Sequence, residues 1–145
     1  GEVPEEEYFI PFGEAAVRRE GTDVTVVGLS KMAHEAMAAA EELAAEGISV
    51  EVIDPRTVLP LDNEIILKSL AKTGRLVVVD ESREYCSFAS EIAAIAVERG
   101  FASLKAPVKR VTVPNVPIPF SPPLEDFVIP DADKIVKAVY QVMDY

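Results

Sequence analysis

The chain has 145 residues, of which 49% are hydrophobic, so it is long enough for one domain with a real core and too short for two. Its formal net charge of −11 would repel phosphate backbones and anionic bilayers, which argues against nucleic acids and membranes as partners and favours a basic one. One cysteine and one histidine rule out an internal disulfide and a Cys/His zinc site, whereas a carboxylate site for magnesium or calcium stays open.

The first segment of the chain is acidic and contains Pro4 and Pro11. This composition is typical of a linker, so we expect residues 1–12 to be an arm from a missing N-terminal domain and residues 13–145 to form the domain itself. The segment lacks the basic and apolar regions of a secretion signal, and the chain has no long apolar run. We therefore expect a cytoplasmic protein without a membrane span.

Near-continuous apolar runs over residues 23–29, 48–53 and 76–79 predict strands that are buried on both faces. Residues 15–20 predict a weak strand, and residues 108–113 alternate in the manner of an edge strand. Between the strands, apolar residues recur at helical spacing. The four stripes are Ala36, Ala39, Ala40, Leu43; Ile66, Leu67, Leu70, Ala71; Phe88, Ile92, Ile95, Ala96; and Ile135, Ala138, Val139, Val142.

Polar residues and glycines delimit these helices. Ser30, Asp62 and Asp131 are the predicted N-caps, and Gly47, Gly74 and Gly100 are the predicted stops. Alternating strands and helices of this length predict an α/β fold. We expect a three-layer α/β/α sandwich with a mostly parallel five-stranded sheet and one weak antiparallel edge strand.

Arg56 lies in a stiff connection between a predicted strand and helix. Pro55 and Pro60 fix their own backbone and bias Asp54 and Leu59 to extended conformations, so the turn presents Arg56 in a defined place. The functional interpretation is an interdomain or subunit contact made by Arg56. The alternative is a rigid strand-to-helix connection and nothing more.

Three polar positions near predicted strand ends are candidate catalytic groups. Ser30 lies in Gly28-Leu29-Ser30-Lys31-Met32, which begins like the nucleophile elbow Gly-x-Ser-x-Gly. Met32 stands where the motif needs its second glycine, so Ser30 is expected to be a helix cap. His34 has no local carboxylate or nucleophile partner, which favours a surface or packing residue. Asp80 and the adjacent Glu81 should point to opposite faces, which favours a solvated loop in which they pair with Arg83.

Cys86 is expected at a helix start together with Ser87, where the helix N-terminus would lower the pKa of its thiol. No basic neighbour can be placed beside it, which favours an unreactive thiol over a reactive one.

Residues 113–126 contain five prolines, which predicts an extended path without helix or central strand. Apolar residues on it are expected to pin the loop against this domain or a partner, and a free polyproline ligand is the alternative. The candidate contact residues are Pro117, Pro119 and Phe120.

Several motifs in order resemble one family. They are Ile53-Asp54-Pro55-Arg56-Thr57 with Pro60 and Asp62, Thr73-Gly74-Arg75-Leu76-Val77-Val78-Val79-Asp80-Glu81, Ala106-Pro107-Val108-Lys109-Arg110-Val111-Thr112, Val116-Pro117-Ile118-Pro119-Phe120 with Leu124-Glu125, Ile129-Pro130, and the lead-in Ile10-Pro11-Phe12-Gly13-Glu14-Ala15. The chain resembles the transketolase C-terminal-like domain of the β subunit of thiamine-diphosphate-dependent 2-oxo-acid dehydrogenases. The resemblance covers essentially the whole chain.

The resemblance implies a non-catalytic module with no catalytic, cofactor-binding or metal-binding residues of its own. Thiamine diphosphate and magnesium would lie in the parent assembly, between the α subunit and the missing N-terminal domain of β. The module would support a heterotetramer of two α and two β subunits, so its partners are its own N-terminal domain, the α subunit and a second β subunit.

Two departures narrow the resemblance. Cys86-Ser87 stands where most pyruvate and branched-chain members have two glycines, and Thr112-Val113-Pro114-Asn115 replaces a Thr-Gly-x-Asp pattern. Both resemble the acetoin-cleaving branch, and a pyruvate or branched-chain dehydrogenase β subunit is the alternative. These replacements also remove permissive backbone positions, so local turns are expected to differ.

The acidic C-terminus suggests a further partner. The family presents acidic groups near this end to a basic subunit-binding domain of the acyltransferase, so the resemblance assigns docking to Asp144 and Tyr145. A different class stays open, in which the chain is a stand-alone small-molecule enzyme with its site near Ser30, Arg56 and Asp80.

Overall fold

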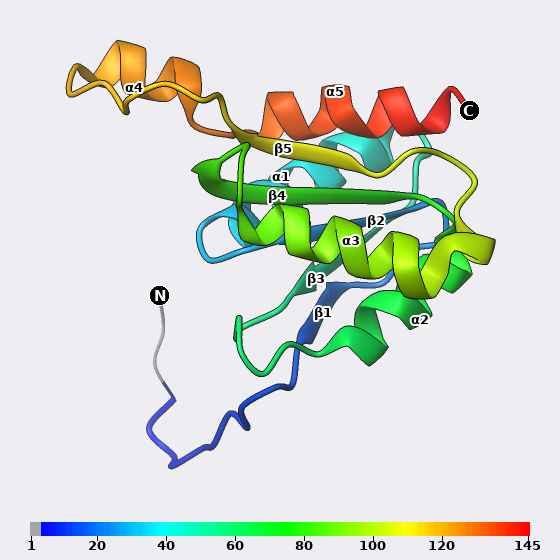
Figure 1. Ribbon diagram of the computed structural model, residues 1–145. Coiled ribbons are helices and arrows are strands. Elements are labelled where there is room, and N and C mark those ends of the chain that lie inside the picture. Colours follow the sequence, from blue (N-terminus) through cyan, green and yellow to red (C-terminus); the bar gives the residue numbers. More distant parts are fainter. Residues whose placement is uncertain (1–3) are drawn as a thin grey trace.

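In the computed structural model, which describes residues 4–145, five strands form one sheet in the order β1-β3-β2-β4-β5 (Figure 1). The strands are β1 Ala16–Arg19, β2 Val24–Gly28, β3 Val50–Asp54, β4 Leu76–Arg83 and β5 Lys109–Val113. Only the β1–β3 pair is antiparallel, and the other three neighbouring pairs are parallel. The predicted mostly parallel sheet with a weak antiparallel edge strand is confirmed, and β5 lies at the other edge, as expected.

Helices cover both faces of the sheet. They are α1 Met32–Ala45, α2 Asn63–Thr73, α3 Phe88–Gly100, the 3-10 turn η1 Phe101–Ser103, α4 Pro122–Val128 and α5 Ala132–Met143. On one face, α1 and α5 pack on the alternate residues Val24 and Val26 of β2. On the other face, α2 and α3 pack on Val27 and on Ile53 of β3. The predicted three-layer α/β/α sandwich is therefore confirmed.

Alternation within the central strands explains the near-continuous apolar runs. Val77 and Val79 of β4 belong to the core under α1 and α5, whereas Leu76 and Val78 belong to the core under α2 and α3. All four side chains have 0% exposure, because both faces of the strand are covered. Burying a side chain of this size contributes about 1.5–3 kcal/mol.

Most of the predicted helix ends are correct. Asp62 Oδ1 accepts from the Ile65 amide at 3.2 Å, and Asp131 Oδ1 accepts from the Lys134 amide at 2.8 Å. Gly74 ends α2 with φ +79, where a left-handed backbone favours glycine, and Gly47 adopts φ +85 just after α1. The predicted cap at Ser30 is wrong, because Lys31 occupies the N-cap of α1 without a side-chain hydrogen bond.

The core under α2 contains polar groups that satisfy one another. Thr25 Oγ1 of β2 lies 2.6 Å from Ser69 Oγ and 2.8 Å from Thr73 Oγ1, both on α2. Glu51 of β3 is also buried, and its carboxylate pairs with the ammonium group of Lys72 on α2. Thr25, Ser69, Thr73 and Glu51 therefore each have a partner, which avoids the cost of an unpaired group.

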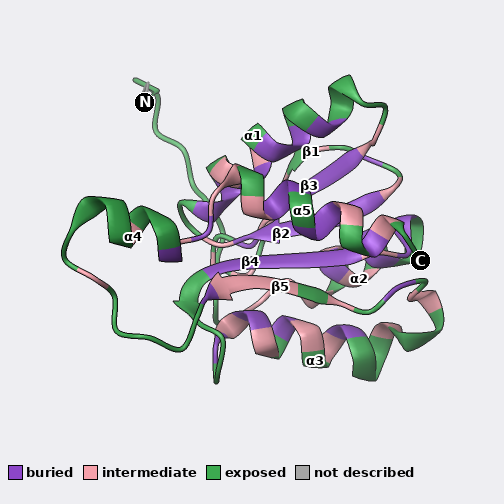
Figure 2. Ribbon diagram, turned by 90° about the horizontal axis from the view of Figure 1, so that it is seen from above, coloured by how far each residue is buried: buried purple, intermediate pink, exposed green. Residues whose placement is uncertain are grey.

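Two segments extend beyond the carboxyl ends of the parallel strands. In Figure 1 the arm before β1 and the segment containing α4 both leave the sandwich on this side, whereas the C-terminus lies at the opposite side. In Figure 2 both segments are coloured almost wholly as exposed. Among the helices of residues 4–145, none is both long and apolar enough to span a bilayer.

Candidate interface at the carboxyl edge of the sheet

Asp54 holds the turn that presents Arg56. Its Oδ1 atom accepts from the Arg56 amide at 3.0 Å, and its Oδ2 atom accepts from Arg18 Nη2 of β1 at 2.5 Å. Arg56 adopts φ +60, a left-handed conformation that costs a residue with a Cβ atom roughly 1–2 kcal/mol. Because the surrounding contacts enforce that backbone conformation, the Cα–Cβ bond of the exposed Arg56 leaves the turn in a fixed direction.

The same loop anchors the N-terminal arm. Thr57 Oγ1 accepts from the Gly13 amide at 3.1 Å and donates to the Pro60 carbonyl at 2.7 Å. Asp62 Oδ2 accepts from the Ala15 amide at 3.1 Å, so one carboxylate both caps α2 and holds the start of β1. Gly13 adopts φ +77, and a Cβ atom there would lie 3.0 Å from Pro60 Cγ. These contacts fix where the arm departs.

The arm itself presents apolar side chains to solvent. Residues 4–12 are all exposed and form neither helix nor strand, and residues 1–3 of the predicted linker lie outside the described part of the chain. Phe9 and Phe12 are 84% and 85% exposed, and Tyr8 and Ile10 are more than half exposed. Apolar side chains gathered in this way are typical of a surface that a partner covers.

The proline-rich segment leads to a second exposed apolar surface. The predicted absence of helix is wrong for its last part, because α4 begins with Pro122 and Pro123 at positions where a helix does not need the missing amide. Phe120 is fully exposed at 101%, and Phe127 of α4 is 77% exposed. Val128 is the only buried residue of α4.

Two of the three candidate contact residues of this segment are exposed. Pro117 is exposed, Pro119 is half-buried and Phe120 touches solvent on all sides. We expected the apolar residues to pin the loop against this domain or a partner; for Phe120 the structure leaves the partner, and that contact stays a prediction. The segment is held instead by Val113 before it and by Val128 and Pro130 after it, all buried.

The exposed apolar side chains of these segments form what we term the carboxyl-edge surface. Its members are Tyr8, Phe9, Ile10, Phe12, Val58, Leu59, Tyr85, Val116, Ile118, Phe120, Leu124 and Phe127. Sequence reasoning singled out Phe120 but missed the aromatic residues of the arm and of α4. For the arm, the signal that could have found them is the aromatic pair Tyr8-Phe9 between Pro4 and Pro11, in a stretch without helix or strand spacing.

A hollow of about 390 Å³ lies at the ends of β2 and β3, where Ser30 and Arg56 come together. Ser30 adopts φ +53, and Gly28 before it lets α1 approach, because a Cβ there would lie 2.5 Å from the Met32 carbonyl oxygen. Asp80 does not line this hollow. Ser30, Arg56 and Asp80, the candidate residues of a stand-alone enzyme, therefore do not line one common hollow.

Asp80 is buried rather than solvated, so the predicted pairing with Arg83 is wrong. Its carboxylate accepts from the Ser82 amide at 2.9 Å and from the Ala89 amide, in the first turn of α3, at 3.2 Å. β4 continues for four residues past the predicted end at position 79. Glu81 is exposed, as the alternation of strand side chains predicts.

The remaining candidate groups are surface residues. His34 is exposed in the first turns of α1, as expected. Cys86 is exposed with φ +53 and precedes Ser87, whose Oγ atom accepts from the Ser90 amide at 3.2 Å as the N-cap of α3. Among residues 4–145, no three His, Cys, Asp or Glu side chains converge where they could hold a metal ion.

The predicted docking residues lie at the other end of the molecule. Asp144 and Tyr145 are exposed beside a hollow of about 300 Å³ that Pro107 and Lys109 also line. The C-terminus is on the side opposite to α4 and the N-terminal arm (Figure 1). The structure therefore separates the two proposed contact regions and does not bring Arg56 or Phe120 near Asp144.

The fold is that of an α/β domain, and its exposed apolar carboxyl-edge surface is suited to be covered by a partner. Residues 13–135 match the family described as "Transketolase, C-terminal domain". The chain therefore belongs to the transketolase C-terminal domain family.

The chain is similar over nearly its whole length to three β subunits of Bacillus subtilis (strain 168). It is 48% identical over 143 residues to "Acetoin:2,6-dichlorophenolindophenol oxidoreductase subunit beta", with 99% of this chain and 42% of that protein covered. For "2-oxoisovalerate dehydrogenase subunit beta" the identity is 40% and the coverage 100% and 45%. For "Pyruvate dehydrogenase E1 component subunit beta" it is 42%, with 99% and 44% covered.

A solved structure shares the fold. The chain matches "Split gene transketolase, inactive beta4 tetramer" with a TM-score of 0.83 and 30% identity, over 99% of this chain and 46% of that one. The chain thus spans less than half the length of each of these relatives.

Proposed function

We propose that the chain is the C-terminal domain of the β subunit of a cytoplasmic, thiamine-diphosphate-dependent dehydrogenase of the acetoin type. In this proposal residues 1–12 link it to a preceding domain, and residues 13–145 form a non-catalytic module. The module supports the association of two α and two β subunits and docks the enzyme to the acyltransferase core of a complex. Resemblance to acetoin, pyruvate and 2-oxoisovalerate enzymes supports the class, and the higher identity to the acetoin relative supports that substrate.

The observation that supports an assembly role most strongly is the carboxyl-edge surface. Phe9, Phe12 and Phe120 are each more than four-fifths exposed, and they belong to the two segments that leave the sandwich on the same side (Figure 1). A large aromatic side chain buries roughly 150–250 Å² when a partner covers it, so each one can contribute several kcal/mol to association. Clusters of this kind are typical centres of binding energy in interfaces.

Arg56 supplies a directional element in this surface. Its backbone is fixed by Asp54, so a partner carboxylate that binds the exposed guanidinium group has to order only the side chain and not the turn. We assign Arg56 to a contact with the preceding domain or the α subunit, together with Pro117, Pro119 and Phe120. Val58 and Leu59, next to it in the same loop, are 57% and 89% exposed and extend the apolar contact.

The proposal assigns thiamine diphosphate and magnesium to other parts of the parent enzyme. The contribution of this chain is positional, because it fixes its neighbours against one another through the carboxyl-edge surface. Docking to a basic subunit-binding domain is assigned to Asp144 and Tyr145 at the opposite end, where electrostatic attraction would speed association.

A domain exchange tests the proposal. This chain replaces the aligned part of the Bacillus subtilis acetoin relative, and the chimera is co-expressed with the α subunit of that enzyme. We expect the two to co-purify and to reduce 2,6-dichlorophenolindophenol with acetoin when thiamine diphosphate and magnesium are supplied, whereas the isolated chain shows no turnover. Turnover by the isolated chain, or a folded chimera that fails to bind the α subunit, would contradict the proposal.

The same exchange into the Bacillus subtilis pyruvate dehydrogenase β subunit separates the substrate alternatives. We expect weaker association with the pyruvate enzyme's α subunit than with the acetoin enzyme's. Equal or stronger association with the former would favour the pyruvate alternative.

A further inference from the structure

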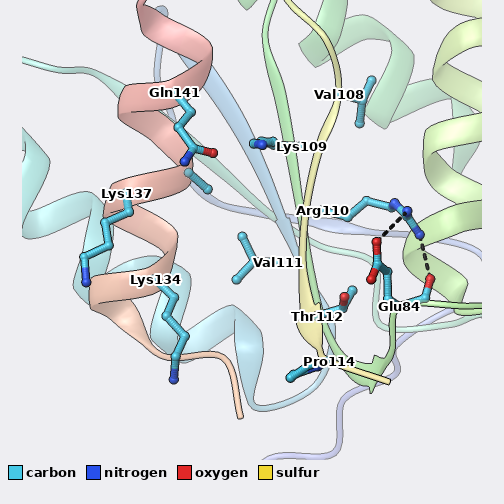
Figure 3. Close-up of a pocket in the computed structure, with 11 residues that line it drawn as sticks. Glu84, Val108, Lys109, Arg110, Val111, Thr112, Pro114, Lys134, Lys137 and Gln141 are labelled. Carbon is cyan, nitrogen blue, oxygen red and sulfur yellow. Dashed lines mark hydrogen bonds and ion pairs between the residues drawn. The ribbon is translucent and has the colours of Figure 1, made fainter. Parts of the chain in front are cut away.

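A second surface on the chain, apart from the carboxyl-edge surface, combines an open strand edge with positive charge. β5 ends the sheet and pairs with β4 along one side only. A groove of about 580 Å³ follows β5 and is bounded by α5 (Figure 3). Four cationic side chains and one carboxylate line it, in a chain whose acidic residues outnumber its basic ones by 25 to 14.

The charges in the groove are divided between its two sides. Arg110 points toward α3, where its Nη1 atom donates to the Glu84 carbonyl at 2.7 Å and to Ser90 Oγ at 2.6 Å (Figure 3). The side chains of Lys109 and Lys137 lie on the α5 side. The one carboxylate of the groove, Glu84, also pairs with Arg110, at 3.8 Å, so it does not neutralise the lysines.

The lysines of the groove differ in how they are engaged. Lys134 Nζ donates to the Ile129 carbonyl at 2.5 Å and pairs with Asp131 Oδ2 at 2.6 Å, so this residue stabilises the start of α5. Lys109 and Lys137 are exposed, and within residues 4–145 neither side chain forms a hydrogen bond or ion pair. These two lysines are therefore free to bind an anion.

We propose that the β5 groove binds an extended acidic segment of a partner protein, which adds to β5 as a further strand. The free edge of β5 supplies main-chain donors and acceptors for such a segment. Alternate side chains of the added strand lie on one face, so acidic residues at every second position would meet Lys109 and Lys137. The intervening side chains would face the α3 side, where Arg110 is already paired.

Two other occupants fit the groove less well. A second copy of this chain, paired edge to edge through β5, would bring two highly acidic molecules together and place lysines of the two strands close to one another. Protection of the edge from aggregation needs only the lysine on the strand, Lys109, and leaves Lys137 of α5 without a role. An added acidic strand would be attracted by both Lys109 and Lys137.

The groove adjoins the C-terminal hollow, because Lys109 and Gln141 line both. Lys137 lines only the groove, so it separates this inference from docking at Asp144 and Tyr145. The inference also does not depend on the proposed function.

Fluorescence anisotropy of the 145-residue chain with a short labelled peptide of alternating glutamate and valine tests the inference at low ionic strength. We expect Lys137→Glu to weaken binding about tenfold, because it replaces an attraction by a repulsion. Lys68→Glu, an exposed lysine on α2 outside the groove, is the matched control and should change affinity less than twofold. Methylation of alternate peptide amides should abolish binding, since strand addition needs them.

Amide hydrogen exchange provides the second readout and depends on no substitution. The bound peptide should slow exchange within residues 109–113. The inference fails if the peptide does not bind, if Lys137→Glu binds as well as the unmodified chain, or if the methylated peptide is equally effective. It also fails if tripolyphosphate of equal charge displaces the peptide while β5 amides gain no protection, because the groove would then be a site for small anions only.

Discussion

Glu51 and Lys72 form an ion pair across the interface between β3 and α2, with the carboxylate side chain 3% exposed and the lysine side chain 40% exposed. The Gly21 amide also donates to Glu51 Oε2, at 3.3 Å, and Lys72 Nζ donates to Glu20 Oε2 at 2.9 Å. Burial raises the pKa of Glu51, but hydrogen bonds from Lys72, Ser69 and Gly21 together outweigh it and hold that pKa below its ordinary value. The buried carboxylate of Glu51 therefore links β3 to Lys72 of α2.

Removal of the lysine should destabilise the fold. Lys72→Met leaves Glu51 buried without its main partner, and we expect a loss of about 2–3 kcal/mol in unfolding free energy, less than for a fully buried pair because Lys72 is partly solvated. Lys68→Met, one turn earlier on α2 and exposed, is the matched control and should change stability by less than about 0.5 kcal/mol. Urea denaturation measures both. Equal effects would show that the pair contributes little.

The same pair predicts a pH dependence. Because the pKa of Glu51 is lowered on folding, its contribution to stability is present above the unfolded pKa, near the ordinary value of 4.5, and is lost as the pH falls through the lower folded pKa. The pKa of Lys72 is raised, chiefly by its hydrogen bond to Glu51, so its contribution is lost only above 10.5. Glu51→Gln should flatten the stability profile below about pH 4.5, and an unchanged profile would contradict this account.

The buried Asp80 gives a test with an adjacent control. Asp80→Ala removes acceptors for the amides of Ser82 and Ala89 in a buried place, and we expect a loss of about 1–3 kcal/mol. Glu81→Ala changes an exposed side chain on the other face of β4 and should be nearly neutral. Thermal denaturation of the two variants measures the difference. If Glu81→Ala destabilised the chain as much as Asp80→Ala, the assignment of Asp80 would be wrong.

Much of the fold could be predicted from the sequence because each central element satisfies a local rule. The valines of β4 alternate between two covered faces, so the strand reads as a continuous apolar run. Asp62, Asp131 and Gly74 each end or begin a helix through contacts within a few residues. Predictions based on short-range chemistry were therefore confirmed.

One error arose from a contact outside the local pattern and two from local backbone features. Asp80 is stabilised by the start of α3, nine positions later, which no pattern within β4 indicates. Ser30 does not cap α1 because its backbone has a positive φ and Lys31 takes the cap position. α4 forms despite Pro122 and Pro123 because prolines are harmless in a first helical turn.

The candidate site was predicted only in part, for a different reason. Arg56 could be singled out because prolines and Asp54 constrain the turn locally. The lysines of the groove come from β5 and α5, and their approach depends on the strand order, which the sequence pattern does not specify. Exposure of Phe120 likewise depends on where the segment leaves the sheet.

Phe120 should matter for association and not for folding. Because its side chain is fully exposed, Phe120→Ala should change the stability of the chain by less than about 0.5 kcal/mol and weaken binding of the chimera to the α subunit by about 2–4 kcal/mol. Phe101→Ala, 72% exposed at the opposite end of the sheet, is the control and should affect neither. Pull-down affinity and thermal denaturation separate the two quantities, and equal losses of affinity would contradict the assignment.

The acidic C-terminus predicts a salt-dependent rate. Asp144→Lys should slow capture of a basic subunit-binding domain by the chimera at low ionic strength, with the difference shrinking as salt is added. Glu41→Lys, an exposed change of equal charge on α1, is the control for net charge. Stopped-flow association rates measure both variants. If the two substitutions had the same effect, the C-terminal carboxylates would serve only as general surface charge.

Hydroxyl-radical footprinting of the chimera, alone and bound to the α subunit, tests the central claim most directly. We expect oxidation of Phe120, Phe127 and Leu59 to fall several-fold on assembly, because these exposed side chains belong to the carboxyl-edge surface. Phe101, at the opposite end of the sheet, should stay equally reactive. If the carboxyl-edge residues were oxidised as fast in the assembled enzyme as in the free chimera, the surface would not be an interface and the account would be wrong.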